Sequence, residues 1–189
     1  AVPVGSTASP PSLITEGSTL TFTVSGLPAG TSTAGVVTTA TTTPNTIGFG
    51  ALTPNVEEIA AHRISVDANA TEGYQVVSYA RSALVDSYGN TIAPVSASNA
   101  SPAPWSTACP GAAASCFGYH PSDPTLSGGS TRFAADDSYA AVPTSSVEIM
   151  YSSVPVDSSH DVIYRARVGP LQPAGVYETE VVYIAIPVF

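Results

Sequence analysis

The chain has 189 residues and a formal net charge of −9; 43% of its residues are hydrophobic and only 10% are charged. This acidic balance argues against a nucleic-acid partner, because no basic stripe could release counterions from phosphates, and against an anionic membrane surface. All five basic residues are arginines, which excludes Schiff-base chemistry and a P-loop lysine.

Residues 1–15, AVPVGSTASPPSLIT, differ from the remainder and predict an extended N-terminal arm. Val2 and Val4 alternate with other residues, and the Pro10-Pro11 pair predicts a stiff hinge before the first clear strand. The alternative interpretation is a disordered terminus. We assign residues 1–15 to the arm and residues 16–189 to a single domain.

Alternation of β-branched and aromatic residues with polar residues predicts strands along most of that domain. The stretch STLTFTVSGL places Leu20, Phe22 and Val24 on one face. Further strands are predicted in AGVVTTATTT, TIGFGAL, EEIAAHRISVDAN with a shift of face inside it, GYQVVSYA, SSVEIMYSS, HDVIYRARV and the terminal GVYETEVVYIAIPVF.

From about residue 82 to 142 the alternation fails, and many of the 17 prolines fall in this stretch. It predicts long loops with two short strands, and no stretch of the chain has a helical period of ten residues or more. The fold class is therefore expected to be all-β, a β-sandwich of immunoglobulin-like or jelly-roll-like type behind an extended N-terminal arm.

Cys109 and Cys116 are the two cysteines, in ACPGAAASC. Their spacing fits neither a CxxC redox motif nor a zinc pattern, so we expect a disulfide that closes a short loop, with a metal or redox pair as the alternative. A disulfide implies an oxidising compartment. The opening AVPVGST is consistent with a cleaved signal peptide, and no apolar run is long enough to span a membrane, so we expect an extracellular or cell-surface protein.

Catalytic patterns are poor. His62, His120 and His160 are the only histidines, and neither a G-x-S-x-G nor an H-E-x-x-H motif occurs, so we expect no enzyme and no cofactor. A weaker feature is a candidate calcium site. The loop 120–137 gathers oxygen and nitrogen donors that could hold calcium or could simply be solvated, namely His120, Asp123, Asp136 and Asp137.

Surface glycans could enter in two ways. Trp105, in SPAPWSTAC, is the aromatic residue best placed in a loop to stack on a sugar, whereas the strand tyrosines are expected to pack in the core. Asn69 in NAT and Asn99 in NAS are glycosylation sequons that predict exposed turns.

The last strand starts with one apolar face and ends apolar on both. Tyr177, Thr179, Val181, Tyr183 and Ala185 share one face, and the other face ends in Val182, Ile184 and Ile186. A strand that is apolar on both faces needs a cover, supplied by this chain or by a neighbour.

The terminal G-x-Y-x-x-x-V-x-Y pattern, preceded by LQPA, resembles the closing strand of spore-coat-U-like and chaperone–usher pilins. The general plan, a secreted sandwich behind a detached N-terminal segment, is similar to TasA-like matrix-fibre subunits. This resemblance implies a filament or pilus of identical subunits, in which the arm of one subunit completes the sheet of the next by donor-strand exchange.

On this basis we expect donor-strand anchors at Val2 and Val4, with Leu13 and Ile14 at the point where the arm enters the neighbour. The acceptor groove is expected near Val182, Ile184 and Ile186. The alternative function is a monomeric cell-surface or secreted module that binds carbohydrate.

Overall fold

The structure is a computed structural model, and it describes residues 17–111 and 113–189. The protein is all-β, as predicted, and its sheets are antiparallel. Helical structure in the described ranges is limited to α1 (Trp105–Ala108) and the 3-10 turn η1 (Ser127–Gly129). Within those ranges no helix is long and apolar enough to cross a membrane.

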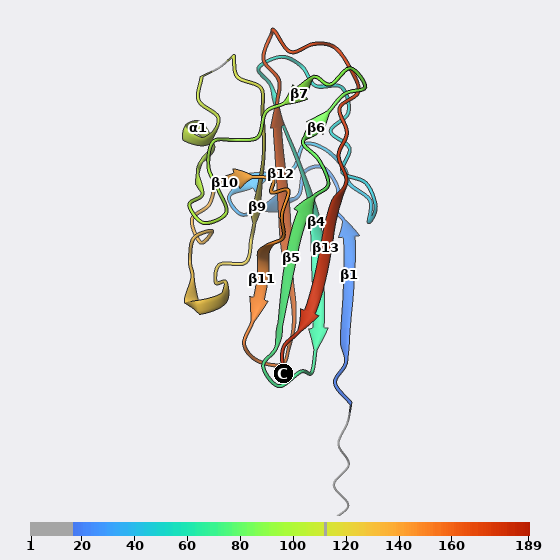
Figure 1. Ribbon diagram of the computed structural model, residues 1–189, viewed down its shortest axis with the longest axis vertical. Coiled ribbons are helices and arrows are strands. Elements are labelled where there is room, and N and C mark those ends of the chain that lie inside the picture. The colour runs from blue at the N-terminus through green and yellow to red at the C-terminus, as the bar shows by residue number, and fades with distance from the viewer. Residues whose placement is uncertain (1–16, 112) are drawn as a thin grey trace, which may run out of the picture.

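The largest sheet has six strands in the order β1-β4-β12-β9-β10-β8. These strands are β1 (Leu20–Gly26), β4 (Glu57–Ala68), β12 (Val156–Arg167), β9 (Cys116–Pro121), β10 (Ser138–Ala141) and β8 (Ala103–Pro104). The long strands β4 and β12 pair over their full length and form the centre of the sheet (Figure 1).

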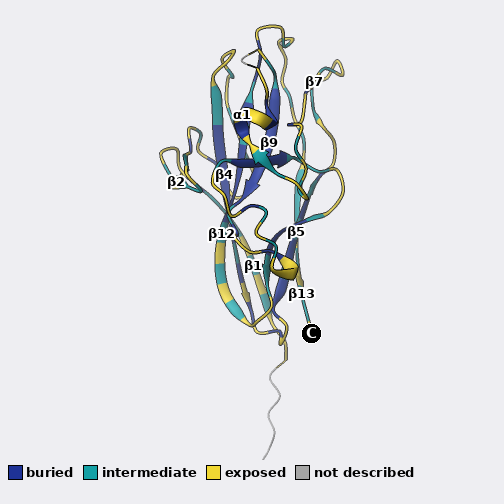
Figure 2. Cartoon of the chain, turned by 90° about the vertical axis from the view of Figure 1, so that its left-hand side faces the viewer, coloured by how far each residue is buried: buried dark blue, intermediate teal, exposed yellow. Residues whose placement is uncertain are grey.

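A second sheet has three strands in the order β11-β5-β13, namely β11 (Val147–Ser152), β5 (Tyr74–Ala80) and β13 (Val181–Pro187). Figure 2 shows the two sheets as separate layers, with buried residues in both. Two short hairpins complete the fold: β2 (Ser32–Thr33) with β3 (Val36–Val37), and β6 (Leu84–Val85) with β7 (Thr91–Ile92).

The main core lies between the two sheets. It takes Ile64 and Val66 from β4, Tyr164 from β12, and Val76 from β5. Leu20, Phe22 and Val24 of β1 pack against this cluster as half-buried residues, on the face that the alternation predicts. Full burial of an aliphatic side chain contributes about 1.5–3 kcal/mol, so this interface is the main source of stability.

A second core lies on the opposite face of the six-stranded sheet. Ile59 and Ala61 of β4 and Ile163 of β12 pack there beneath the segment that carries Trp105 and the two cysteines. The predicted shift of face within β4 has a simple cause, because its odd-numbered residues Ile59 and Ala61 serve one core and its even-numbered residues Ile64 and Val66 serve the other. The strand itself continues without a break in register.

Residues 82–142 contain more regular structure than expected. Five short strands lie there, and three of them, β8, β9 and β10, belong to the six-stranded sheet. By contrast, the predicted strand in residues 46–52 does not form. Ile47, Phe49 and Leu52 still pack against the main core, but no strand is assigned to this segment.

Candidate functional site

The two sheets each end in an edge strand on the same side of the molecule. In the structure as described, β1 pairs only with β4 and β13 pairs only with β5. Figure 1 shows β1 and β13 on the same side of the molecule, and a groove of about 1440 Å³ is lined by residues of both strands. This open side is the candidate functional site.

The free edge of β13 presents backbone groups without ladder partners. The Arg81 N–H donates to the Glu180 carbonyl at 2.9 Å, just before β13 begins. The even-numbered residues of β13 are therefore the ones whose backbone groups bond to β5. Because backbone groups alternate between the two sides of a strand, the odd-numbered residues direct their N–H and C=O groups to the open edge. These residues are Val181, Tyr183 and Ala185.

The free edge of β1 follows the same rule. The Asn69 N–H donates to the Thr19 carbonyl at 3.2 Å, so odd-numbered residues bond to β4 and the backbone of the even-numbered residues faces the opening. Leu20, Phe22 and Val24 therefore have backbone groups at the edge and side chains toward the core. The groove thus lies between two unpaired strand edges, an arrangement that could accept another strand.

The side chains from β1, β4 and β13 that line the groove are Phe22, Val24, His62, Val181 and Tyr183. Residues 46–52 form part of the rim, where Phe49 packs edge-on against Phe117 with ring centres 6.1 Å apart. The walls next to the two edges are mainly apolar, which favours an apolar side chain on anything that enters.

Two buried rings and the half-buried Tyr183 form a polar chain next to the groove. The hydroxyls of Tyr164 and Tyr183 lie 2.8 Å apart, and the Tyr183 hydroxyl lies 3.3 Å from His62 Nδ1. Burial raises the pKa of both tyrosines, and burial lowers the pKa of His62 although the carbonyls of Thr46 and Thr43 partly oppose that shift. All three rings are therefore uncharged at neutral pH.

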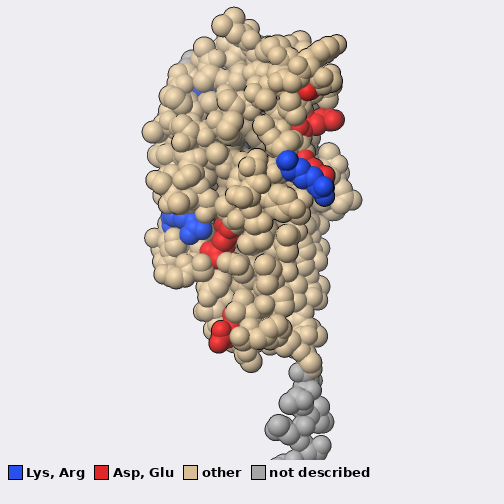
Figure 3. Space-filling view, in the orientation of Figure 1, with Lys and Arg blue, Asp and Glu red and all other residues tan. Residues whose placement is uncertain are grey.

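The acceptor residues expected from the sequence lie elsewhere. Val182, Ile184 and Ile186 belong to the outer face of the three-stranded sheet, where Ile184 and Ile186 are 41% and 42% exposed. Their neighbours Val181 and Tyr183 line the groove instead. The terminal strand does border the groove, but with its opposite face. Figure 3 shows few charged side chains on the outer face.

The donor-strand residues Val2, Val4, Leu13 and Ile14 lie outside the described residues, as does the whole arm 1–15.

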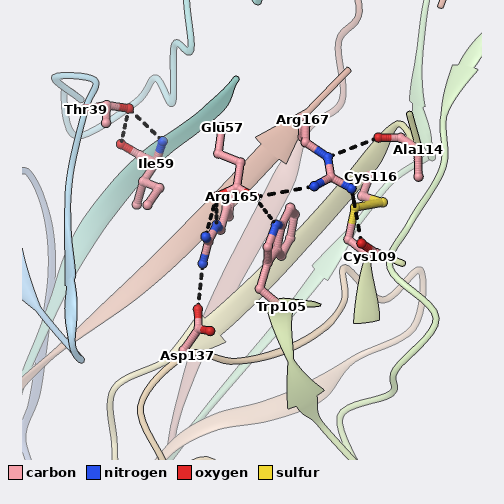
Figure 4. A network of polar contacts seen from close by, with 10 residues as sticks. All are labelled: Thr39, Glu57, Ile59, Trp105, Cys109, Ala114, Cys116, Asp137, Arg165 and Arg167. Carbon is pink, nitrogen blue, oxygen red and sulfur yellow. Dashed lines mark hydrogen bonds and ion pairs between the residues drawn. A yellow bond between two sulfur atoms is a disulfide. The ribbon is translucent and has the colours of Figure 1, made fainter. Parts of the chain in front are cut away.

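Cys109 and Cys116 form a disulfide, with Cα atoms 5.8 Å apart. Arg167 holds the loop that this bond closes, because its guanidinium donates to the carbonyls of Cys109 at 3.1 Å and Ala114 at 3.2 Å (Figure 4). It also donates to the Gly111 carbonyl at 2.6 Å. The disulfide thus fastens a surface loop to the six-stranded sheet.

Trp105 is not available to stack on a sugar. It is only 3% exposed, and its Nε1–H donates to Glu57 at 2.6 Å. The guanidinium carbon of Arg165 lies 4.7 Å from the ring centre, and Arg165 also pairs with Glu57 and with Asp137 (Figure 4). Trp105 is therefore a structural residue of the second core, which corrects the role suggested by its position in a loop.

The sequons differ in their surroundings. Asn69 is exposed on the turn after β4, and its Oδ1 accepts a hydrogen bond from the Thr19 N–H at 2.6 Å. The Nδ2 of Asn99 donates to the Tyr119 hydroxyl at 2.6 Å and to the Glu148 carbonyl at 3.1 Å. A glycan on Asn99 would replace these internal bonds, whereas the Nδ2 of Asn69 makes only a long, exposed hydrogen bond to the Gly17 carbonyl at 3.4 Å.

The residues of loop 120–137 point to different partners. His120 Nδ1 lies 2.6 Å from the Ser138 carbonyl, and the buried carboxylate of Asp123 accepts from the backbone N–H groups of Thr125 and Tyr151. Asp137 pairs with Arg165. In the part of the chain that the structure describes, no group of three or more such side chains is placed to hold a metal ion.

His62 and Tyr183 were not singled out for the groove by the sequence. From the sequence, His62 is one of three histidines without a catalytic motif, and Tyr183 is a packing residue of the last strand. A polar ring at an even-numbered position of β4, among the core residues Ile64 and Val66, was the available signal.

Comparisons of the chain with protein-family models, with curated proteins and with solved structures find no match. The resemblance of residues 175–189 to the closing strand of pilins therefore stays a prediction.

Proposed function

We propose that this protein is a structural subunit of an extracellular filament that polymerises head-to-tail by donor-strand exchange. The observation that carries the proposal is the groove between β1 and β13, where two unpaired strand edges flank apolar walls. Residues 1–15 of one subunit would fill the groove of the next. The two sheets would then form one β-sandwich that is closed by the inserted strand.

Unpaired edges are normally protected in a stable protein. Long exposed edges invite association, and natural proteins blunt them with charges, prolines or bulges. The free edge of β13 contains Val181, Tyr183 and Ala185 and reaches a proline only at Pro187. An incoming strand would satisfy its backbone groups, and that gain favours assembly.

The direction of the strands favours a head-to-tail arrangement. In Figure 1, β1 begins at the lower end of the molecule and runs upward, whereas β13 runs downward to the C-terminus at that same end. The chain before β1 therefore departs from the lower end. In a stack of equally oriented subunits it would enter the groove of the subunit below from the top and run antiparallel to β13.

The reach of the arm is sufficient. About fourteen extended residues span roughly 45 Å, which is comparable to the width of a domain of this size. A contact that joins the arm of one subunit to the groove of another is heterologous and does not close on itself, so it propagates into a filament. The disulfide Cys109–Cys116 fits an oxidising, extracellular location.

Electron microscopy of the purified full-length chain tests the proposal. Wild-type protein is expected to form filaments, and Val4→Asp is expected to abolish them because a charge would enter an apolar groove. Val154→Asp, at an exposed position outside the groove, is the matched control and should assemble normally. Filaments of normal appearance from a chain that lacks residues 1–15 would contradict the proposal.

A further inference from the structure

Residues 46–52, the rim segment of the groove, have a strand-like sequence and a free backbone. Among the described residues, no backbone N–H or carbonyl from Ile47 to Leu52 bonds to another backbone group. Ile47 and Phe49 are half-buried against the main core, whereas Gly48 between them is exposed. The rim segment therefore has the alternating faces of a strand without a ladder partner.

The rim segment continues the wall that β1 begins. Gly26, the last residue of β1, lies opposite His62, and the backbone of Thr42 and Thr43 lies against Gly26. The chain thus returns to the end of β1 just before the rim segment starts. Residues of the rim segment line the same groove as Val181 of β13. The groove therefore has β13 in one wall, and β1 followed by the rim segment in the other.

The geometry of a β-ladder determines which residues of the arm would face the rim segment. In the proposed orientation, Val2 and Val4 direct their side chains into the groove, as Val181 of β13 does. Directly opposite residues of an antiparallel pair share a face, and their backbone groups either both point to the partner strand or both point away. Because the backbone of Val181 points to the open edge, the even-numbered residues of the arm bond to β13. The odd-numbered residues then direct their backbone to the other wall.

A proline distinguishes these odd-numbered positions. Pro3 has no N–H to donate, whereas Gly5 and Thr7 keep both backbone groups. Gly5 and Thr7 also lie nearer the upper end of the groove, because the arm enters from the top and runs parallel to β1. The rim segment lies at that upper end, beyond the last residue of β1.

On the basis of the proposed function, we infer that the rim segment is a second acceptor edge of the groove, whose backbone hydrogen-bonds to Gly5 and Thr7 in the arm of a second copy. The length of the arm allows this. Five residues beside Val181–Ala185 span about 17 Å of the roughly 45 Å that the extended arm reaches, and the remainder crosses between subunits. The rim segment becomes a strand only in the filament.

Hydrogen exchange in monomer and wild-type filaments tests this inference at Ile47, Gly48 and Phe49. Backbone alternation directs either Gly48 or both of its neighbours to the arm, and those amides are expected to exchange about tenfold or more slowly in filaments. Unchanged exchange at all three, while Tyr183 becomes protected, overturns only the role of the rim segment. Absence of wild-type filaments, or of protection at both places, overturns this inference and the proposed function together.

Cysteine cross-linking tests the contact itself. Gly48 faces open space, and Gly5 and Thr7 of the inserted arm face outward beside it. Gly48→Cys combined with Gly5→Cys or with Thr7→Cys is expected to give a ladder of disulfide-linked subunits when filaments are oxidised.

Thr23→Cys in place of Gly48→Cys is the matched control, because Thr23 is exposed on the face of β1 that points away from the groove, and it should give no ladder. Normal filaments without a ladder from either Gly48→Cys combination overturn the role of the rim segment. If these variants do not assemble, hydrogen exchange of the wild-type chain decides alone.

Discussion

The hydroxyls of Tyr164 and Tyr183 meet at 2.8 Å and connect the centre of the six-stranded sheet to the edge strand of the other sheet. Both rings belong to the main core, and Tyr183 extends the contact to His62 next to the groove. The position of the free edge of β13 therefore depends on a buried polar contact as well as on apolar packing.

Replacement of Tyr164 by Phe should lower the free energy of unfolding by about 1–2 kcal/mol, because the buried Tyr183 hydroxyl loses a partner. Urea unfolding followed by tryptophan fluorescence measures this change. Tyr88→Phe is the matched control, because Tyr88 is 87% exposed and its loss of a hydroxyl should have little effect. Equal effects of the two substitutions would show that the Tyr164–Tyr183 contact contributes nothing.

Arg165 should be the most sensitive charged residue. Its substitution by Met leaves the partly buried Glu57 without its main partner beneath the Trp105 segment, and we expect a loss of about 1.5–3 kcal/mol, the usual value of hydrogen bonds to a charged group. Arg81→Met provides the comparison, since Arg81 and Glu180 form an exposed pair of the kind that contributes about 0–1 kcal/mol. Urea unfolding of both variants tests the contrast, and a loss below 1 kcal/mol for Arg165→Met would contradict it.

Acid should weaken the fold through two buried histidines. Burial lowers the pKa of His62, opposed by the carbonyls of Thr46 and Thr43, and burial lowers the pKa of His120, opposed by the Ser138 carbonyl and by Asp136 and Asp137. The unfolded chain then binds protons first as the pH falls.

Both histidines contribute their full stability above the unfolded pKa of about 6.5, and that stability declines from there down to their lowered folded pKa values. Urea unfolding at pH 7.5 and at pH 5.5 should show the decline for the wild type and a smaller decline for the His62→Gln/His120→Gln double variant. The same decline in both proteins would assign it to other groups.

The disulfide should be complete in the native protein. Mass spectrometry after alkylation is expected to find no free thiol, and replacement of both cysteines by Ser should cost about 2.5 kcal/mol by the chain-entropy model for so short a loop. Arg167 should keep the loop close to the sheet even without the bond, through its contacts with the backbone. Two alkylatable thiols in native protein would contradict the pairing.

Strands with one apolar face could be predicted from the sequence, as β1 and β5 show. In β5 buried residues alternate with half-buried ones, and in β1 half-buried residues alternate with exposed ones as far as Thr23. The sequence does not predict β9, because all six of its residues are buried and apolar residues therefore do not alternate with polar ones. Residues 46–52 have the opposite property: Ile47 and Phe49 alternate with glycines, but core packing alone holds them and no ladder forms.

The groove could be placed only in part. The terminal strand was expected to border it, but both faces of β13 are apolar, so composition could not decide between Val181 with Tyr183 and Val182 with Ile184. That choice depends on which face packs toward β12. The structural role of Trp105 in the second core could not be predicted either, because its partners Glu57 and Arg165 are distant along the chain.

Hydrogen exchange at the free edge of β13 tests the central claim most directly. The amides of Val181, Tyr183 and Ala185 should exchange rapidly in the monomer and should become strongly protected in filaments, because the inserted arm would accept their hydrogen bonds. The amides of Val182 and Ile184, which already bond to β5, are the internal reference. Filaments in which Val181, Tyr183 and Ala185 exchange as fast as in the monomer would contradict donor-strand insertion beside β13.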